Sequence, residues 1–123
     1  MDILKSKAKA FLLSVSSSKV KEGYDLYVGD NFRHHNVYFK GDTDSLRMAM
    51  QENYEMYPDK KLEIKRIIRE ENIVVVHSLA KLKPGDAGIT LIHIIRFENE
   101  KIVELWDLGQ KIPSLAINEN GPF

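Results

Sequence analysis

Two residues that can transfer protons lie in a stretch that otherwise has the composition of buried strands. Residues 91–110 read LIHIIRFENEKIVELWDLGQ, two apolar runs around a polar turn, which is the pattern of a β-hairpin. His93 lies in the first run and Asp107 in the second. A carboxyl group is costly to bury as an unpaired charge, and a low-dielectric site raises its pKa toward neutrality. The pair therefore predicts a site for general acid–base chemistry.

Whether these side chains meet depends on the register of two hairpins. If the earlier turn centres on Gly85, His77 lies directly opposite His93. If the later turn is regular, His93 lies opposite Trp106, whereas one bulge residue brings Asp107 opposite it. A cluster of His77, His93 and Asp107 is therefore expected only with a bulge. Taken alone, His77 fits a packed strand residue better than a catalyst.

Other side chains could contact a ligand. His34 and His35 are adjacent, so in an extended segment they point in opposite directions and at most one can face a cavity. Tyrosines at helical spacing are more typical of a helix core than of a ligand cage, and among them we keep Tyr54 as a candidate substrate contact. Trp106, next to the acidic residue of the hairpin, is a second candidate.

Hydrophobic periodicity predicts the elements that position these residues. Apolar residues at helical spacing indicate helices between Leu4 and Val15, between Ser18 and Gly29, and from Asp42 or Thr43 to Pro58. The segment NFRHHNVYFKGDTD between the last two reads as irregular or as a short extended piece. Four runs rich in Val, Ile and Leu then follow, separated by turn signals, and predict an antiparallel meander. Helices followed by strands indicate an α+β fold, with residues 1–123 forming one domain.

Composition restricts the function classes. The 123 residues include 18 Lys plus Arg and 18 Asp plus Glu, so no basic surplus favours a nucleic acid or an anionic membrane as partner. The absence of cysteine excludes disulfides, thiolate nucleophiles and cysteine-ligated zinc. No glycine-rich phosphate loop is present, so we expect no nucleotide cofactor, and in fact no cofactor of any kind. No window approaches the length of a membrane span, which favours a soluble, cytoplasmic protein.

The sequence resembles the SnoaL-like polyketide cyclases of the NTF2-like superfamily over nearly the whole chain. The matching pieces are HHN at 34–36, IVVVHSLAKLKPGD at 73–86, IRFENEKIVELWD at 95–107 and the terminal NENGPF. The branch it resembles most is the group of predicted SnoaL-like aldol-condensation enzymes. The resemblance implies a cone-shaped α+β fold in which a curved sheet and the helices enclose an apolar pocket.

The resemblance also implies roles for individual residues. Asp107 matches the aspartate that acts as general acid and base in SnoaL-type cyclases, and His93 matches the histidine that accompanies it. His35 and Asn36 match a segment whose side chains approach the pocket, which places His35 inward and His34 outward. The sequence departs from the pattern of that branch at His93, where aspartate is usual, and at His34, where the motif has glutamine.

The function expected from these observations is a cofactor-free acid/base enzyme, of the aldol cyclase or isomerase type, that acts on a small apolar carbonyl compound. Three alternatives stay open. The pocket could bind a small ligand without chemistry, as many NTF2-like proteins do. His77, His93 and Asp107 could hold a metal ion, although no spacing signature supports this and we expect none. The domain could also be a purely structural dimerisation module.

A homodimer is expected from the apolar character of both faces of the meander. The runs NIVVVHSLA and ITLIHII do not alternate between apolar and polar residues, as a sheet with one solvated face should. Helices and a pocket can cover one face. A second subunit related by two-fold symmetry is the simplest cover for the outer face.

Overall fold

A computed structural model describes residues 2–115 and 117–123 and contains three helices and five strands. The elements in chain order are α1 (Ile3–Val15), α2 (Val20–Tyr27), β1 (Val28–His34), α3 (Thr43–Met56), β2 (Lys61–Glu70), β3 (Ile73–Lys81), β4 (Ile89–Glu98) and β5 (Lys101–Lys111). The predicted α+β class, the three helices and the meander of four strands are confirmed. Within the described part of the chain, no helix is both long enough and apolar enough to cross a membrane.

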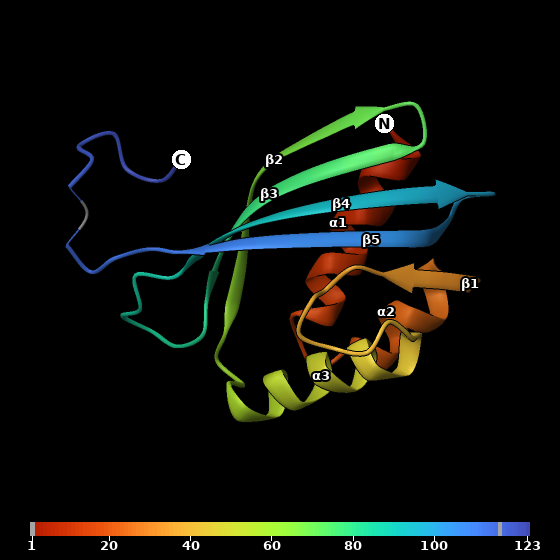
Figure 1. Ribbon diagram of the computed structural model, residues 1–123, viewed down its shortest axis with the longest axis horizontal. Helices are drawn as coiled ribbons and strands as arrows, with labels where there is room; N and C mark the ends of the chain where they lie inside the picture. The colour runs from red at the N-terminus through yellow and green to blue at the C-terminus, as the bar shows by residue number, and fades with distance from the viewer. Residues whose placement is uncertain (1, 116) are drawn as a thin grey trace.

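The five strands form one mixed sheet in the order β1-β5-β4-β3-β2. The meander from β2 to β5 is antiparallel, and β1 pairs in parallel with β5. The strand β1 begins at Val28, within the end of the predicted second helix, and continues into the segment that we expected to be irregular or only briefly extended. The helices lie on one side of the sheet, with α1 against β2 and β3, and α3 against α2 and β1 (Figure 1). The strand β2 bends along its length, and an extra residue, Lys65, interrupts its pairing with β3.

The core lies between α1, α2 and the inner face of the sheet. The apolar stripe of α1 points inward, and Phe11 and Leu12 are almost completely buried. They meet Ile95 and Leu105, which face each other across β4 and β5 on the inner face. An N-cap begins α1, since the Asp2 carboxylate accepts a hydrogen bond from the Lys5 N–H at 3.1 Å. Asp42 caps α3 in the same way, as one of the two expected positions.

A bulge in β5 sets which side chains share the inner face. Arg96 pairs with Glu104 but Phe97 pairs with Ile102, so Val103 is an extra residue in β5. This shift brings Asp107 directly opposite His93, as expected for a hairpin with a bulge. Residues directly opposite in an antiparallel pair project to the same face, so both side chains point inward.

The register expected for the preceding hairpin is wrong by one residue. Val76, not His77, lies opposite His93, and His77 pairs with Ile92. The turn is centred between Pro84 and Gly85 rather than on Gly85. Because side chains alternate along a strand, this single step places His77 on the outer face.

The outer face of the sheet carries the apolar side chains that motivated the dimer. Ile68 and Leu108 are exposed there, while Val75, Ile92 and Ile94 are half-buried. The homodimer stays a prediction: light scattering at roughly tens of micromolar, a range typical of weak dimers, should give twice the mass of one chain. Ile68→Glu should shift that mass toward the monomer without unfolding the chain. A monomeric wild-type protein would contradict the prediction.

Candidate functional site

Asp107 lies on the wall of a cavity at one end of the sheet. The strand β1 ends with His34 paired to Leu105, so β5 continues past it with a free edge. The chain then turns, and Asn36 crosses toward β5. The Asn36 Nδ2 donates a hydrogen bond to the Asp107 Oδ2 at 2.9 Å. The carboxylate is therefore held from the loop that follows β1.

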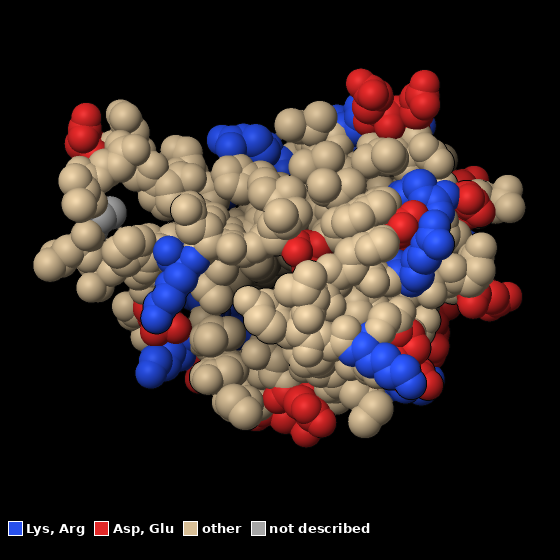
Figure 2. Space-filling model, in the orientation of Figure 1, with Lys and Arg blue, Asp and Glu red and all other residues tan. Residues whose placement is uncertain are grey.

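The cavity has a volume of about 1250 Å³ and is open to solvent. The loop after β1, the turn between β3 and β4, the ends of β4 and β5, and Tyr57 enclose it. Ala80, Ile89 and Leu91 form an apolar wall on the inner face. Figure 2 shows a hollow near the middle of one face of the molecule, with an acidic group at its rim. Asp107 therefore lines a cavity, but this cavity is open to solvent, whereas the pocket that the resemblance implies is enclosed.

His93 lies directly opposite Asp107 and is 7% exposed. Burial lowers the pKa of His93 to about 4, although the nearby charge of Asp107 opposes this shift. The imidazole is therefore neutral at pH 7. Among the residues that the structure describes, no hydrogen bond joins the two side chains, and the His93 Nδ1 is buried without a partner. The direct partner of Asp107 is Asn36.

The burial expected for the two adjacent histidines is wrong, although His35, and not His34, lines the cavity as expected. His34 is inside and only 6% exposed, whereas His35 is exposed. The His34 Nε2–H donates to the Lys40 carbonyl at 2.7 Å, and its Nδ1 accepts from the Asn36 N–H at 3.2 Å. Parallel pairing of β1 with β5 decides which histidine points inward, and this long-range contact has no local sequence signal. His34 thus holds the backbone of the residue that contacts Asp107.

His35 and Trp106 meet on the outer side of β5. Their rings stack nearly parallel, 7° apart in orientation and 4.9 Å between centroids. The backbone N–H of His35 also donates a hydrogen bond to the Leu105 carbonyl at 2.9 Å. Both residues also line the cavity, and their rings stack on the outer side of β5.

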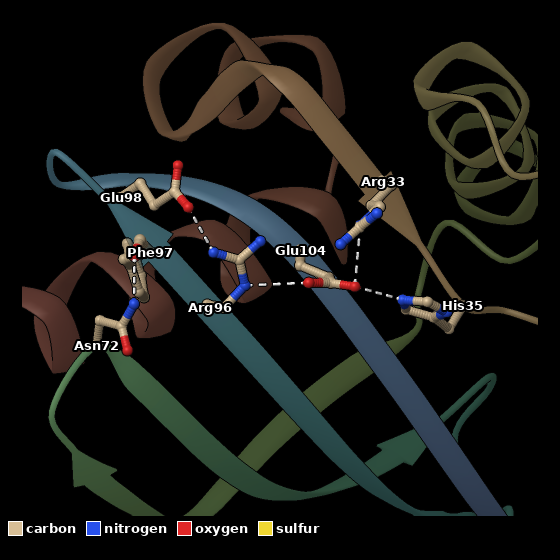
Figure 3. Close-up of polar contacts among 7 residues, drawn as sticks. All are labelled: Arg33, His35, Asn72, Arg96, Phe97, Glu98 and Glu104. Atoms are coloured by element: carbon tan, nitrogen blue, oxygen red, sulfur yellow. Dashed lines mark hydrogen bonds and ion pairs between the residues drawn. The ribbon is translucent and has the colours of Figure 1, made fainter.

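A buried carboxylate anchors this corner of the sheet. Glu104 is 6% exposed and contacts the Arg33 Nε at 3.1 Å, the Arg96 Nε at 3.0 Å and the His35 Nε2 at 2.6 Å (Figure 3). The hydrogen bond from His35 is the main reason that the pKa of Glu104 lies below its ordinary value, and both arginines lower it further. The cluster joins β1, β4 and β5 immediately before Asn36. Sequence reasoning missed this cluster; the available signal was a glutamate inside the apolar run IVELW.

Two sequence candidates lie away from Asp107. His77 is on the outer face, where its Nδ1 lies 2.6 Å from the Arg66 Nη1 and its ring lies 5.0 Å from that of Phe123. Its placement rules out the metal site with His93 and Asp107, and residues 2–115 and 117–123 contain no other group of three suitable side chains. Tyr54 is half-buried on α3, and it is Tyr57 that lines the cavity.

Comparison with known proteins gives structural likenesses only. No family model matches the sequence, and no curated protein matches it. One similar structure is a protein from Agrobacterium tumefaciens that is provisionally named an isomerase of the SnoaL-like family. Its TM-score is 0.73 at 11% identity, and the match covers 89% of this chain and 99% of that chain. A provisionally named polyketide cyclase from Acidithiobacillus ferrooxidans has a TM-score of 0.71, 15% identity, and 88% coverage of each chain.

An NTF2-like protein of unknown function from Cytophaga hutchinsonii also matches, with a TM-score of 0.70, 12% identity, and coverage of 87% of this chain and 89% of that chain. The likeness spans most of each chain, and its identity is low. It therefore establishes the fold and leaves the activity to be argued from the site. The chain has the α+β fold shared by SnoaL-like and NTF2-like proteins.

Proposed function

We propose that the protein is a cofactor-free acid/base enzyme, of the aldol cyclase or isomerase type, that acts on a small apolar carbonyl compound. The observation that carries this proposal is the state of the Asp107 carboxylate. Asn36 holds its Oδ2, while its Oδ1 accepts no hydrogen bond from any described residue. One oxygen is thus fixed and the other is available at the wall of an apolar cavity.

This arrangement suits removal of a proton from carbon. The free oxygen of Asp107 takes the proton alpha to a carbonyl group, and the electron pair of the C–H bond forms an enolate. Return of that proton to a different carbon gives isomerisation. Attack of the enolate carbon on a second carbonyl gives aldol closure. The neutral imidazole of His93 lies directly opposite Asp107, although it does not itself line the cavity, and it would donate an N–H to an oxygen that reaches past Asp107 without adding charge.

The similar structures support this class of reaction without selecting one member of it. One is provisionally named an isomerase and another a polyketide cyclase. Aldol closure, and an isomerisation that moves a proton alpha to a carbonyl, both begin from an enolate, which is the species that we propose the site forms. A small-ligand-binding protein without turnover is the alternative. It is favoured by the missing hydrogen bond between His93 and Asp107, since an acid/base pair is often directly coupled.

The proposal predicts exchange of alpha protons in a model ketone. 2-Tetralone, a bicyclic apolar ketone, should lose its alpha protons to D₂O faster with the protein than in matched buffer. The loss of these protons is followed by NMR. An outer-face variant, His77→Ala, should keep the full rate because His77 lies away from the cavity. Binding of 2-tetralone without accelerated exchange would instead establish the binding-protein alternative for this ketone.

A further inference from the structure

Two buried polar atoms on the inner face of the sheet have no hydrogen-bond partner in the described part of the chain. They are the Ser78 Oγ and the His93 Nδ1, and they are unpartnered among the residues that the structure describes. Ser78 is fully buried and His93 is 7% exposed. Buried polar groups in folded proteins are almost always paired, because an unpaired one forfeits its hydrogen bond to water. Two such atoms close together therefore require an explanation.

The strand register makes these two side chains neighbours on the inner face of the sheet. Neither lines the cavity, but each lies directly opposite a residue that does. Val76 lies opposite His93 and Ser78 lies opposite Leu91, so Ser78 and His93 are diagonal neighbours on one face of β3 and β4. Diagonal neighbours lie roughly 7 Å apart at their Cβ atoms, a span that one bound oxygen can bridge. Leu91, opposite Ser78, and Asp107, opposite His93, both line the cavity.

We propose that Ser78 and His93 form a polar subsite that binds an uncharged oxygen of the ligand, a hydroxyl or a carbonyl. This inference rests on the proposed function in taking the cavity as the site of a small apolar ligand. The hydroxyl of Ser78 can donate or accept, and a neutral imidazole has one nitrogen of each kind. Together they match a neutral oxygen at the leading end of an apolar body.

The distribution of charge argues against an anionic group at this end. A carboxylate or phosphate bound there would lie next to the carboxylate of Asp107. The lysines that line the cavity are Lys83, in the turn between β3 and β4, and Lys111, at the end of β5. Lys111 pairs with Ile89, four residues along the strand from the pair of His93 and Asp107. The described cations of the cavity are thus at its other end.

The subsite is tested with two probes of equal shape, 2-naphthol and 2-methylnaphthalene, which differ by a hydroxyl in place of a methyl group. Their dissociation constants are measured by calorimetry. Ser78→Ala should weaken the binding of 2-naphthol about tenfold relative to that of 2-methylnaphthalene, because one buried hydrogen bond to the ligand is lost. His93→Phe should do the same. Thr90→Val, which removes a hydroxyl from the outer face of β4, should leave the ratio of the two constants unchanged.

An unchanged ratio in Ser78→Ala would overturn the proposal and leave a trapped water as the partner of both atoms. Ser78→Ala removes one oxygen atom only, so it decides the question even if His93→Phe does not fold. The measurement is an equilibrium and needs no turnover. The two proposals can therefore fail separately. If the wild-type protein prefers 2-naphthol but does not accelerate proton exchange in 2-tetralone, the result contradicts the acid/base function and not the subsite.

Discussion

Asp107→Asn is expected to lower the rate of alpha-proton exchange in 2-tetralone by about 10² to 10⁴-fold, the usual contribution of a positioned general base. Asparagine has the shape of aspartate but cannot take the proton. Its side-chain oxygen can still accept the hydrogen bond that Asn36 donates to Asp107, so the loop after β1 should keep its place. The exchange rate measured by NMR, with circular dichroism to confirm the fold, checks this expectation.

Asp86→Asn is the matched control for this experiment. Asp86 also lines the cavity, but it lies in the turn between β3 and β4, where its carboxylate accepts a hydrogen bond from the Lys83 N–H at 3.3 Å. The same chemical change at that position should leave the exchange rate within about twofold of wild type, because the general-base effect needs contact with the reacting proton. If Asp107→Asn exchanges alpha protons at the wild-type rate, Asp107 is not the general base.

The parts of the fold that were predictable are those with a local signal. The stripe of apolar residues in α1 and the capping Asp42 of α3 mark helices by themselves. The meander was equally clear, because short turns join its strands. Even the opposition of His93 and Asp107 could be anticipated as one of two registers. What the sequence did not reveal was which register the β5 bulge would select.

The parts that could not be predicted depend on long-range contacts. The strand β1 exists because it pairs with β5, about seventy residues later in the chain. That pairing turned His34 inward and His35 outward, against the expectation. The expected centre of the turn near Gly85 was wrong by one residue, so His77 lies on the outer face and not on the inner face. Ser78 became a candidate only when burial showed that its hydroxyl has no partner among the described residues.

The glutamate that anchors β1 to β5 should matter most for stability. Glu104→Gln is expected to lower the free energy of unfolding by about 2 to 3 kcal/mol at neutral pH, since it weakens hydrogen bonds to three cationic or ionisable side chains. The loss stays below that of a fully buried ion pair because Arg33 and His35 are partly exposed and can turn toward solvent. Urea denaturation followed by circular dichroism measures it.

The pH dependence of that loss identifies its origin. The folded-state pKa of Glu104 lies below its ordinary value of 4.5, so its contribution is complete above that pH and disappears as the pH falls through the folded pKa. The difference in the free energy of unfolding between wild type and Glu104→Gln should therefore become smaller in acid. Burial of neutral His93 also destabilises the protein below about pH 6.5, but both proteins share that loss and it cancels.

Glu98→Gln is the control for this experiment. It alters only an exposed partner of Arg96, and it should lower the free energy of unfolding by less than about 0.5 kcal/mol. A difference for Glu104→Gln that stays constant from about pH 7 to pH 3 would show that packing, and not the charge of Glu104, holds β1 against β5.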